Sequence, residues 1–286
     1  MKIETLASNL TFTECPRWHQ NKLWFSDFHS QRVYSLDSQG NLNVELTIND
    51  QPAGLGFTPN GELRIVSQTQ KRLLAFDGQS ITTIADMSSL ATGNCNDMVM
   101  TRKGGAYIGN FGFDFHADDF RPKAANLIFV APDGKVSKAA ENLFFPNGSV
   151  IIDDTLIVAE SMGYCLTAFT INADGSLSNR RCWADLGQPK NFTIDQFRLG
   201  QKIPGAITPD GIALAKDGGI WVAPLKKELI KVIEGGEVVE RIPFDQSVIA
   251  VAVSDKNDLY VCTTNHLTPN ACLKHRSARI ERVVFD

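Results

Sequence analysis

The sequence predicts an all-β protein, a six-bladed β-propeller formed by a single domain over residues 1–286. Three observations predict it: a hairpin pattern that recurs six times, a repeat spacing that suits four-stranded blades, and strand-like segments at both ends of the chain. Each copy contains a strand, a turn rich in Gly, Asn or Asp, and a second strand with a short apolar core.

The second strand of each copy is recognised by a compact group of mostly apolar residues. The middle residues of these groups stand at positions 24, 64, 107, 157, 221 and 260, so the steps between them are 40, 43, 50, 64 and 39 residues. Most of these steps suit a blade of four strands. The longest step contains an insertion near residues 185–207, which we expect to form a surface loop. A many-stranded β-sandwich, the alternative fold, does not explain six matched copies.

The two ends of the chain also have strand patterns. Residues 3–6 precede the first copy, and residues 280–285 follow the last. Pairing these segments within one blade would close the ring and remove exposed strand edges. We therefore expect a ring closed by the N- and C-terminal strands.

Composition limits the partners and the compartment. The net charge is −4 and the isoelectric point is about 5.8, which argues against a nucleic-acid partner. No apolar run approaches the roughly 18 residues that span a bilayer, and no secretory signal pattern is present. We expect a cytoplasmic monomer or homodimer that meets small molecules rather than membranes. The six cysteines predict reduced thiols, with a bridge between Cys262 and Cys272 left open.

Polar residues recur at one position of the repeat. Innermost strands of a propeller line its central channel, so equivalent residues of different copies converge there. Converging carboxylates are poorly solvated, and a divalent cation relieves their repulsion; oxygen donors suit Ca²⁺, Mg²⁺ or Mn²⁺. The alternative is that the Asn-Gly and Asp-Gly pairs only form turns. The residues at this position are Glu14, Gly54, Asn96 or Asp97, Asn147, Asp210 and Ala250.

Four motifs give the chain a family resemblance. They are Glu14-Cys15-Pro16-Arg17-Trp18, Asn96-Asp97, Asn147-Gly148 and Pro209-Asp210-Gly211. Together they resemble the SMP-30/gluconolactonase/luciferin-regenerating family over essentially the whole chain. The resemblance implies a six-bladed propeller with one metal ion in its channel, which opens lactone rings with water.

The resemblance also implies roles for individual residues. It implies Glu14, Asn147 and Asp210 as metal ligands, with Ca²⁺ the expected ion and Mn²⁺, Mg²⁺ and Zn²⁺ the alternatives. Asp210 is the expected general base, and Asn94 and Asn96 are the expected substrate contacts. Sugar-lactone hydrolases of the family often carry Arg at the position of Asn94, whose amide cannot form the same bidentate hydrogen bonds. This departure argues against a hexonolactone substrate.

Two further questions remain open at the level of sequence. An ester or organophosphate hydrolase would use the same metal, and a non-catalytic, metal-stabilised propeller that binds a small molecule is a second alternative. Phenylalanines in residues 111–113 and 144–145 either give the channel an apolar pocket or belong to the core. Cys15 and Cys95 adjoin the predicted site, and we expect both to pack into blade cores.

Overall fold

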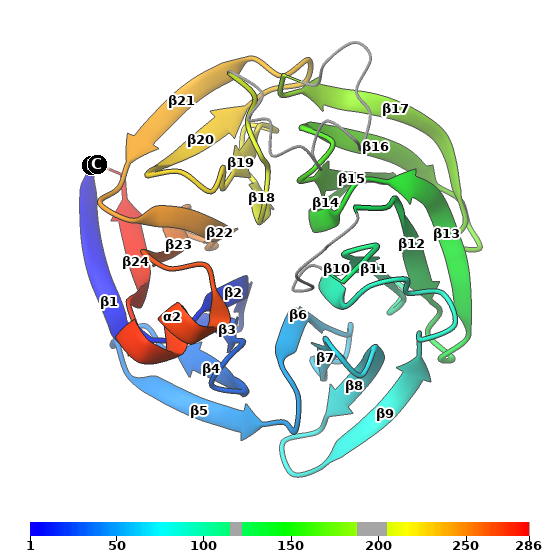
Figure 1. Ribbon diagram of the computed structural model, residues 1–286, viewed down its shortest axis with the longest axis horizontal. Helices are drawn as coiled ribbons and strands as arrows, with labels where there is room; N and C mark the ends of the chain where they lie inside the picture. The colour runs from blue at the N-terminus through cyan, green and yellow to red at the C-terminus, as the bar shows by residue number, and fades with distance from the viewer. Residues whose placement is uncertain (115–121, 188–204, 286) are drawn as a thin grey trace.

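The computed structural model describes residues 1–114, 122–187 and 205–285. Six four-stranded antiparallel sheets form a ring around a central channel, which confirms the predicted propeller (Figure 1). The innermost strands are β2 (Thr13–His19), β6 (Pro52–Phe57), β10 (Cys95–Met100), β14 (Pro146–Ile152), β18 (Ile212–Leu214) and β22 (Ser247–Val253). The second strands, β3 (Lys22–Asp27), β7 (Leu63–Ser67), β11 (Ala106–Asn110), β15 (Thr155–Glu160), β19 (Ile220–Val222) and β23 (Leu259–Thr264), complete the six predicted hairpins.

The outer half of each blade follows in chain order. The third strands are β4 (Arg32–Leu36), β8 (Arg72–Phe76), β12 (Ala125–Val130), β16 (Cys165–Ile171), β20 (Glu228–Val232) and β24 (Ala278–Val284). The fourth strands of the first five blades are β5 (Leu42–Thr47), β9 (Ile81–Asp86), β13 (Val136–Leu143), β17 (Leu177–Asp185) and β21 (Val238–Pro243). Most of the predicted insertion at 185–207 lies outside the described residues.

The sixth blade takes its outer strand from the other end of the chain. β1 (Lys2–Leu10) pairs with β24, so that Lys2 lies opposite Val284, and the two strands lie side by side at the rim of the ring (Figure 1). The predicted closure is confirmed. The short helix α2 (Pro269–His275), which precedes β24, was not predicted. Among the described residues, no helix is long and apolar enough to cross a membrane.

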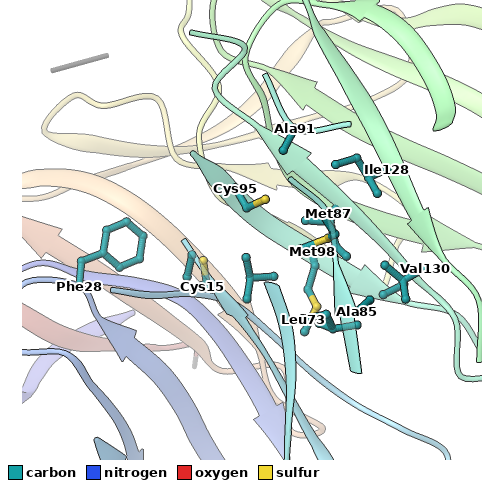
Figure 2. Packing of buried hydrophobic residues seen from close by; sticks show 14 residues of the cluster. Cys15, Phe28, Leu73, Ala85, Met87, Ala91, Cys95, Met98, Ile128 and Val130 are labelled. Atoms are coloured by element: carbon teal, nitrogen blue, oxygen red, sulfur yellow. The ribbon is translucent and has the colours of Figure 1, made fainter. Parts of the chain in front are cut away.

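The hydrophobic core lies within and between the blades. One cluster combines Cys15 of β2 with Cys95 and Met98 of β10, all nearly inaccessible to solvent (Figure 2). This burial raises the pKa of the Cys95 thiol to about 12 and that of Cys15 well above its usual value. Both thiols therefore stay protonated and serve as packing groups, as predicted. Cys262 and Cys272 are also free thiols, which answers the open question of a bridge.

Two glycines beside the predicted ligands allow neighbouring inner strands to approach closely. A Cβ atom on Gly148 would lie 2.5 Å from the Ile212 nitrogen, and one on Gly211 would lie 2.4 Å from Cβ of Ala250. Neither glycine has a positive φ, so neither is required by a turn. The Asn147-Gly148 and Asp210-Gly211 pairs are thus contacts between blades rather than turn dipeptides.

This packing makes a prediction for Gly148→Ala. The added methyl group would push β14 away from the backbone of the next blade, and we expect a loss of about 1–3 kcal/mol in the free energy of unfolding, as for overpacked cores. Denaturant unfolding would measure it. Ser149→Ala is the matched control on the same strand, since it removes one 3.2 Å hydrogen bond and inserts nothing. An equal effect of the two changes would contradict the packing argument.

Candidate functional site

The predicted ligands come together in one cavity. Glu14 lies in β2, Asn96 in β10 and Asn147 in β14, while Asp210 lies two residues before β18; all four line a cavity of about 220 Å³. The four side chains come from four different blades, as their shared position in the repeat predicted. Asn94 is half-buried ahead of β10 and is not among the residues that line this cavity.

Irregular pairing of the inner strands occurs where the site residues lie. The pairing of β2 with β3 shifts between Glu14 and Arg17, and Cys15 has a left-handed backbone with φ of 51°. β10 has the same kind of shift just after Cys95, and β14 has one just after Pro146. A β-bulge bends a strand and redirects its side chains. Asn96 and Asn147 therefore lie within bulges, and Glu14 directly precedes one.

Hydrogen bonds within and between blades fix the pair formed by Asn147 and Asp210. The Asp210 nitrogen donates to the Ala223 carbonyl at 2.8 Å, and the Gly148 nitrogen donates to the Asp210 carbonyl at 3.3 Å. The Asn147 side-chain nitrogen donates to Asp210 Oδ1 and also to Ser161 Oγ. Ser161 in turn donates to the Pro209 carbonyl at 2.6 Å. The amide and the carboxylate are thus held side by side.

Burial makes the two carboxylates hard to ionise together. Desolvation and the negative charge of Asp97 raise the pKa of Asp210 to about 8, against the hydrogen bond from Asn147, which lowers it. Desolvation, then the charge of Asp210, raise the pKa of Glu14 well above its usual value. Each side chain retains only 6% of its exposure. Ionising both groups would therefore place negative charge where solvent does not stabilise it, and no lysine or arginine of the described residues lines the cavity.

Asp97 contributes to this field from outside the cavity lining. Its Oδ1 accepts hydrogen bonds from Arg17 Nη2 at 2.6 Å and from its neighbour Met98 N at 2.8 Å. The sequence grouped Asn96 and Asp97 at one position, and the structure separates them. Asn96 lines the cavity, whereas Asp97 forms a buried ion pair with Arg17 beside it.

The donor set fits a hard divalent cation. Glu14 and Asp210 supply carboxylate oxygens, and Asn147 and Asn96 can supply amide oxygens. Among residues 1–114, 122–187 and 205–285, no group of three or more His, Cys, Asp and Glu side chains is placed to hold a metal. A cation here would therefore rest on two carboxylates plus amides. Both carboxyl groups have raised pKa values, so a nearby positive charge would stabilise their ionised forms.

The structure adds lining residues that the sequence analysis did not find. Several stand four residues after the middle of an apolar group, where each second strand ends. This second position is shared by the copies of the repeat, in the same way as the first residue of each copy. The lining residues at this position are Phe28, Gln68, Phe111, Ser161 and Leu225. Of these, Phe111 was left open by the sequence as a pocket or core residue, and it lines the cavity together with Phe145.

Comparison with known proteins agrees with this architecture. A model of the SMP-30/gluconolactonase/LRE-like region matches residues 12–265. The chain belongs to this family. A sequence search of curated proteins gave no significant match.

Solved structures of similar fold cover nearly the whole chain. A gluconolactonase from Xanthomonas campestris is 20% identical, with 98% of this chain and 88% of that one covered and a TM-score of 0.75. A luciferin-regenerating enzyme is 17% identical, with coverage of 98% and 94% and a TM-score of 0.76. Regucalcin from Agrobacterium tumefaciens, described as a calcium-binding protein, is 18% identical, with coverage of 97% and 92% and a TM-score of 0.75. At these identities the likeness establishes the shared fold.

The raised carboxyl pKa values predict a pH dependence of stability. An aspartate in the unfolded chain ionises near pH 4, whereas folded Asp210 ionises near pH 8, so the unfolded chain binds fewer protons between these values. The free energy of unfolding of chelator-treated protein should therefore fall as the pH rises from about 4 to 8, by up to about 1.4 kcal/mol per pH unit for this proton.

Denaturant unfolding across this pH range measures the effect. Asp210→Asn should flatten the dependence because its amide does not titrate. Added Ca²⁺ should restore stability at the upper end of the range. A pH slope that is the same in Asp210→Asn and the unchanged protein would contradict the assignment.

Proposed function

We propose that this protein is a divalent-metal-dependent hydrolase that opens a lactone ring with water. One observation carries the proposal: two buried carboxylates, Glu14 and Asp210, share a cavity with the amide of Asn147, and the three come from different blades. Family membership supports the reaction class, and the calcium-binding relative supports Ca²⁺ as the ion.

Glu14, Asn147 and Asp210 would hold the cation. When bound, a divalent cation supplies charge that polarises a carbonyl and lowers the pKa of water. The pKa of Asp210 falls when positive charge is near, which leaves its carboxylate able to accept a proton. We assign Asp210 as the general base that takes a proton from the attacking water and passes it to the ring oxygen. Water adds to the carbonyl carbon, the ring C–O bond breaks, and a hydroxy acid forms.

Asn96 is the proposed substrate contact within the cavity. Its side-chain nitrogen donates to the Pro146 carbonyl at 3.3 Å, a long hydrogen bond that leaves the second N–H to orient a lactone oxygen. Asn94 remains a predicted contact, and the Asn94 carbonyl accepts a hydrogen bond from the Phe111 nitrogen at 2.9 Å. The Asn94 backbone thereby holds the backbone of Phe111, which lines the cavity.

A lactone-hydrolysis assay tests the proposal. Proton release from aldonolactones, alkyl lactones and an aryl ester would be followed with a pH indicator, before and after chelator treatment and with Ca²⁺, Mn²⁺, Mg²⁺ or Zn²⁺ restored. We expect turnover of a lactone that the chelator abolishes and a metal restores. Turnover of the aryl ester alone would favour an esterase, and metal binding without turnover of any substrate would favour a binding propeller.

The role of Asp210 predicts the effect of Asp210→Asn. Loss of a general base lowers kcat by about 10²–10⁴-fold, and loss of a charged ligand weakens metal binding as well. Rates should therefore be measured at saturating metal, with metal affinity measured separately by calorimetry. Asp217→Asn is the matched control, since Asp217 is an exposed aspartate of the same blade. Full turnover by metal-loaded Asp210→Asn would remove the base assignment.

A further inference from the structure

Apolar side chains provide most of the accessible wall of the cavity outside the end that holds Glu14 and Asp210. Seven of its sixteen lining residues are apolar, and four of these are phenylalanines. The rings of Phe111 and Phe145 stack with centroids 4.5 Å apart, and Phe12 and Phe28 form a second pair at 5.5 Å. Among the described residues, no lysine or arginine lines the cavity. Such walls offer few partners for hydroxyl or acidic groups of a ligand.

Leu267 marks the exposed part of the cavity lining. Glu14 and Asp210 are 6% exposed, whereas Leu267, which lines the same cavity, is 54% exposed. A ligand that enters past Leu267 with its reactive group near Asp210 would leave its remaining atoms against the aromatic rings. A cavity of about 220 Å³ has room for a small ring and a short chain, because an apolar cavity of about 150 Å³ holds benzene.

Among the polar residues that also line the cavity, Gln68 has a buried side-chain donor without a partner. Gln68 lines the cavity at the end of β7 and is only 2% exposed, and its Nε2 has no hydrogen-bond acceptor among the described residues. The Gln68 backbone is fixed on both sides. Its nitrogen donates to the Gln51 carbonyl at 3.0 Å, and its carbonyl accepts from the Cys95 nitrogen at 3.0 Å. A buried donor without an acceptor is costly, which is typical of a group that a ligand satisfies.

We propose that the cavity selects lactones with an apolar substituent and that Gln68 donates a hydrogen bond to a lactone oxygen. This inference rests on the proposed function above and names its substrate class. The ring oxygens meet the metal-binding end and Gln68, while an alkyl or aryl substituent packs on Phe111 and Phe145. A polyhydroxylated lactone would bury hydroxyl groups against these rings without partners.

Two lactones with the same six-membered ring test the preference. We expect metal-loaded protein to hydrolyse an alkyl-substituted δ-valerolactone with a kcat/KM about 100-fold above that for glucono-δ-lactone, the discrimination typical of an apolar pocket against hydroxyl groups. Both rates are corrected for spontaneous hydrolysis. Equal rates, or a preference for the polyhydroxylated ring, would overturn the inference and leave the hydrolase proposal intact.

Gln68→Leu tests the hydrogen bond. We expect KM for the alkyl lactone to rise about tenfold, with kcat changed much less and Ca²⁺ affinity unchanged, because Gln68 contacts substrate rather than the cation. Gln70→Leu, an exposed glutamine two residues along, is the matched control. An unchanged KM in Gln68→Leu would refute the role of Gln68.

A binding measurement separates this inference from the proposed reaction. The matching alkyl-substituted and polyhydroxylated lactams keep the carbonyl acceptor and resist hydrolysis, and each is titrated calorimetrically into metal-loaded protein. We expect the alkyl lactam to bind at least tenfold more tightly, and less tightly to Gln68→Leu. Preferential binding without turnover of any lactone would retain the ligand class while the hydrolase proposal fails. Absence of binding by the alkyl lactam would overturn the inference.

Discussion

The burial of two carboxylates at the axis of the ring is the constraint on which the site depends. Glu14 and Asp210 share one cavity, and the pKa of each is raised by desolvation and by neighbouring negative charge. Two ionised carboxylates buried together in a protein core are unfavourable unless a compensating group stabilises them. The ring supplies the rigidity that keeps the two together, because each comes from a different blade and β1 closes the ring against β24.

Close approach of the inner strands turns this ring into a site. Gly148 and Gly211 let the backbones of adjacent blades approach to distances that any Cβ would prevent. The Gly148 nitrogen donates a hydrogen bond to the Asp210 carbonyl. Gly148 thereby helps to position the Asp210 side chain, which lines the cavity. Each Asn-Gly or Asp-Gly pair therefore does two things. The first residue places an oxygen-bearing side chain in the cavity, and the glycine lets the next blade approach closely.

The repeat in the sequence was sufficient for the fold and for four of the cavity residues, because both follow from periodicity. Glu14, Asn96, Asn147 and Asp210 share one position in their blades, and the structure brings them together. Periodicity could not show the β-bulges, which depend on local backbone pairing, and so it could not separate Asn96 from Asp97. A second shared position of the repeat could have placed Gln68 in the cavity, but its unpaired side-chain donor exists only once the chain has folded.

Asn147 offers different side-chain atoms to a carboxylate and to a cation. Its side-chain nitrogen uses both hydrogens, one on Asp210 and one on Ser161. A cation would bind the amide oxygen, so Asn147 could ligate it while its nitrogen still donates to Asp210. Neutral Asn147 can partner a carboxylate and a cation, whereas a third carboxylate here would add to the repulsion that already raises the pKa values of Glu14 and Asp210.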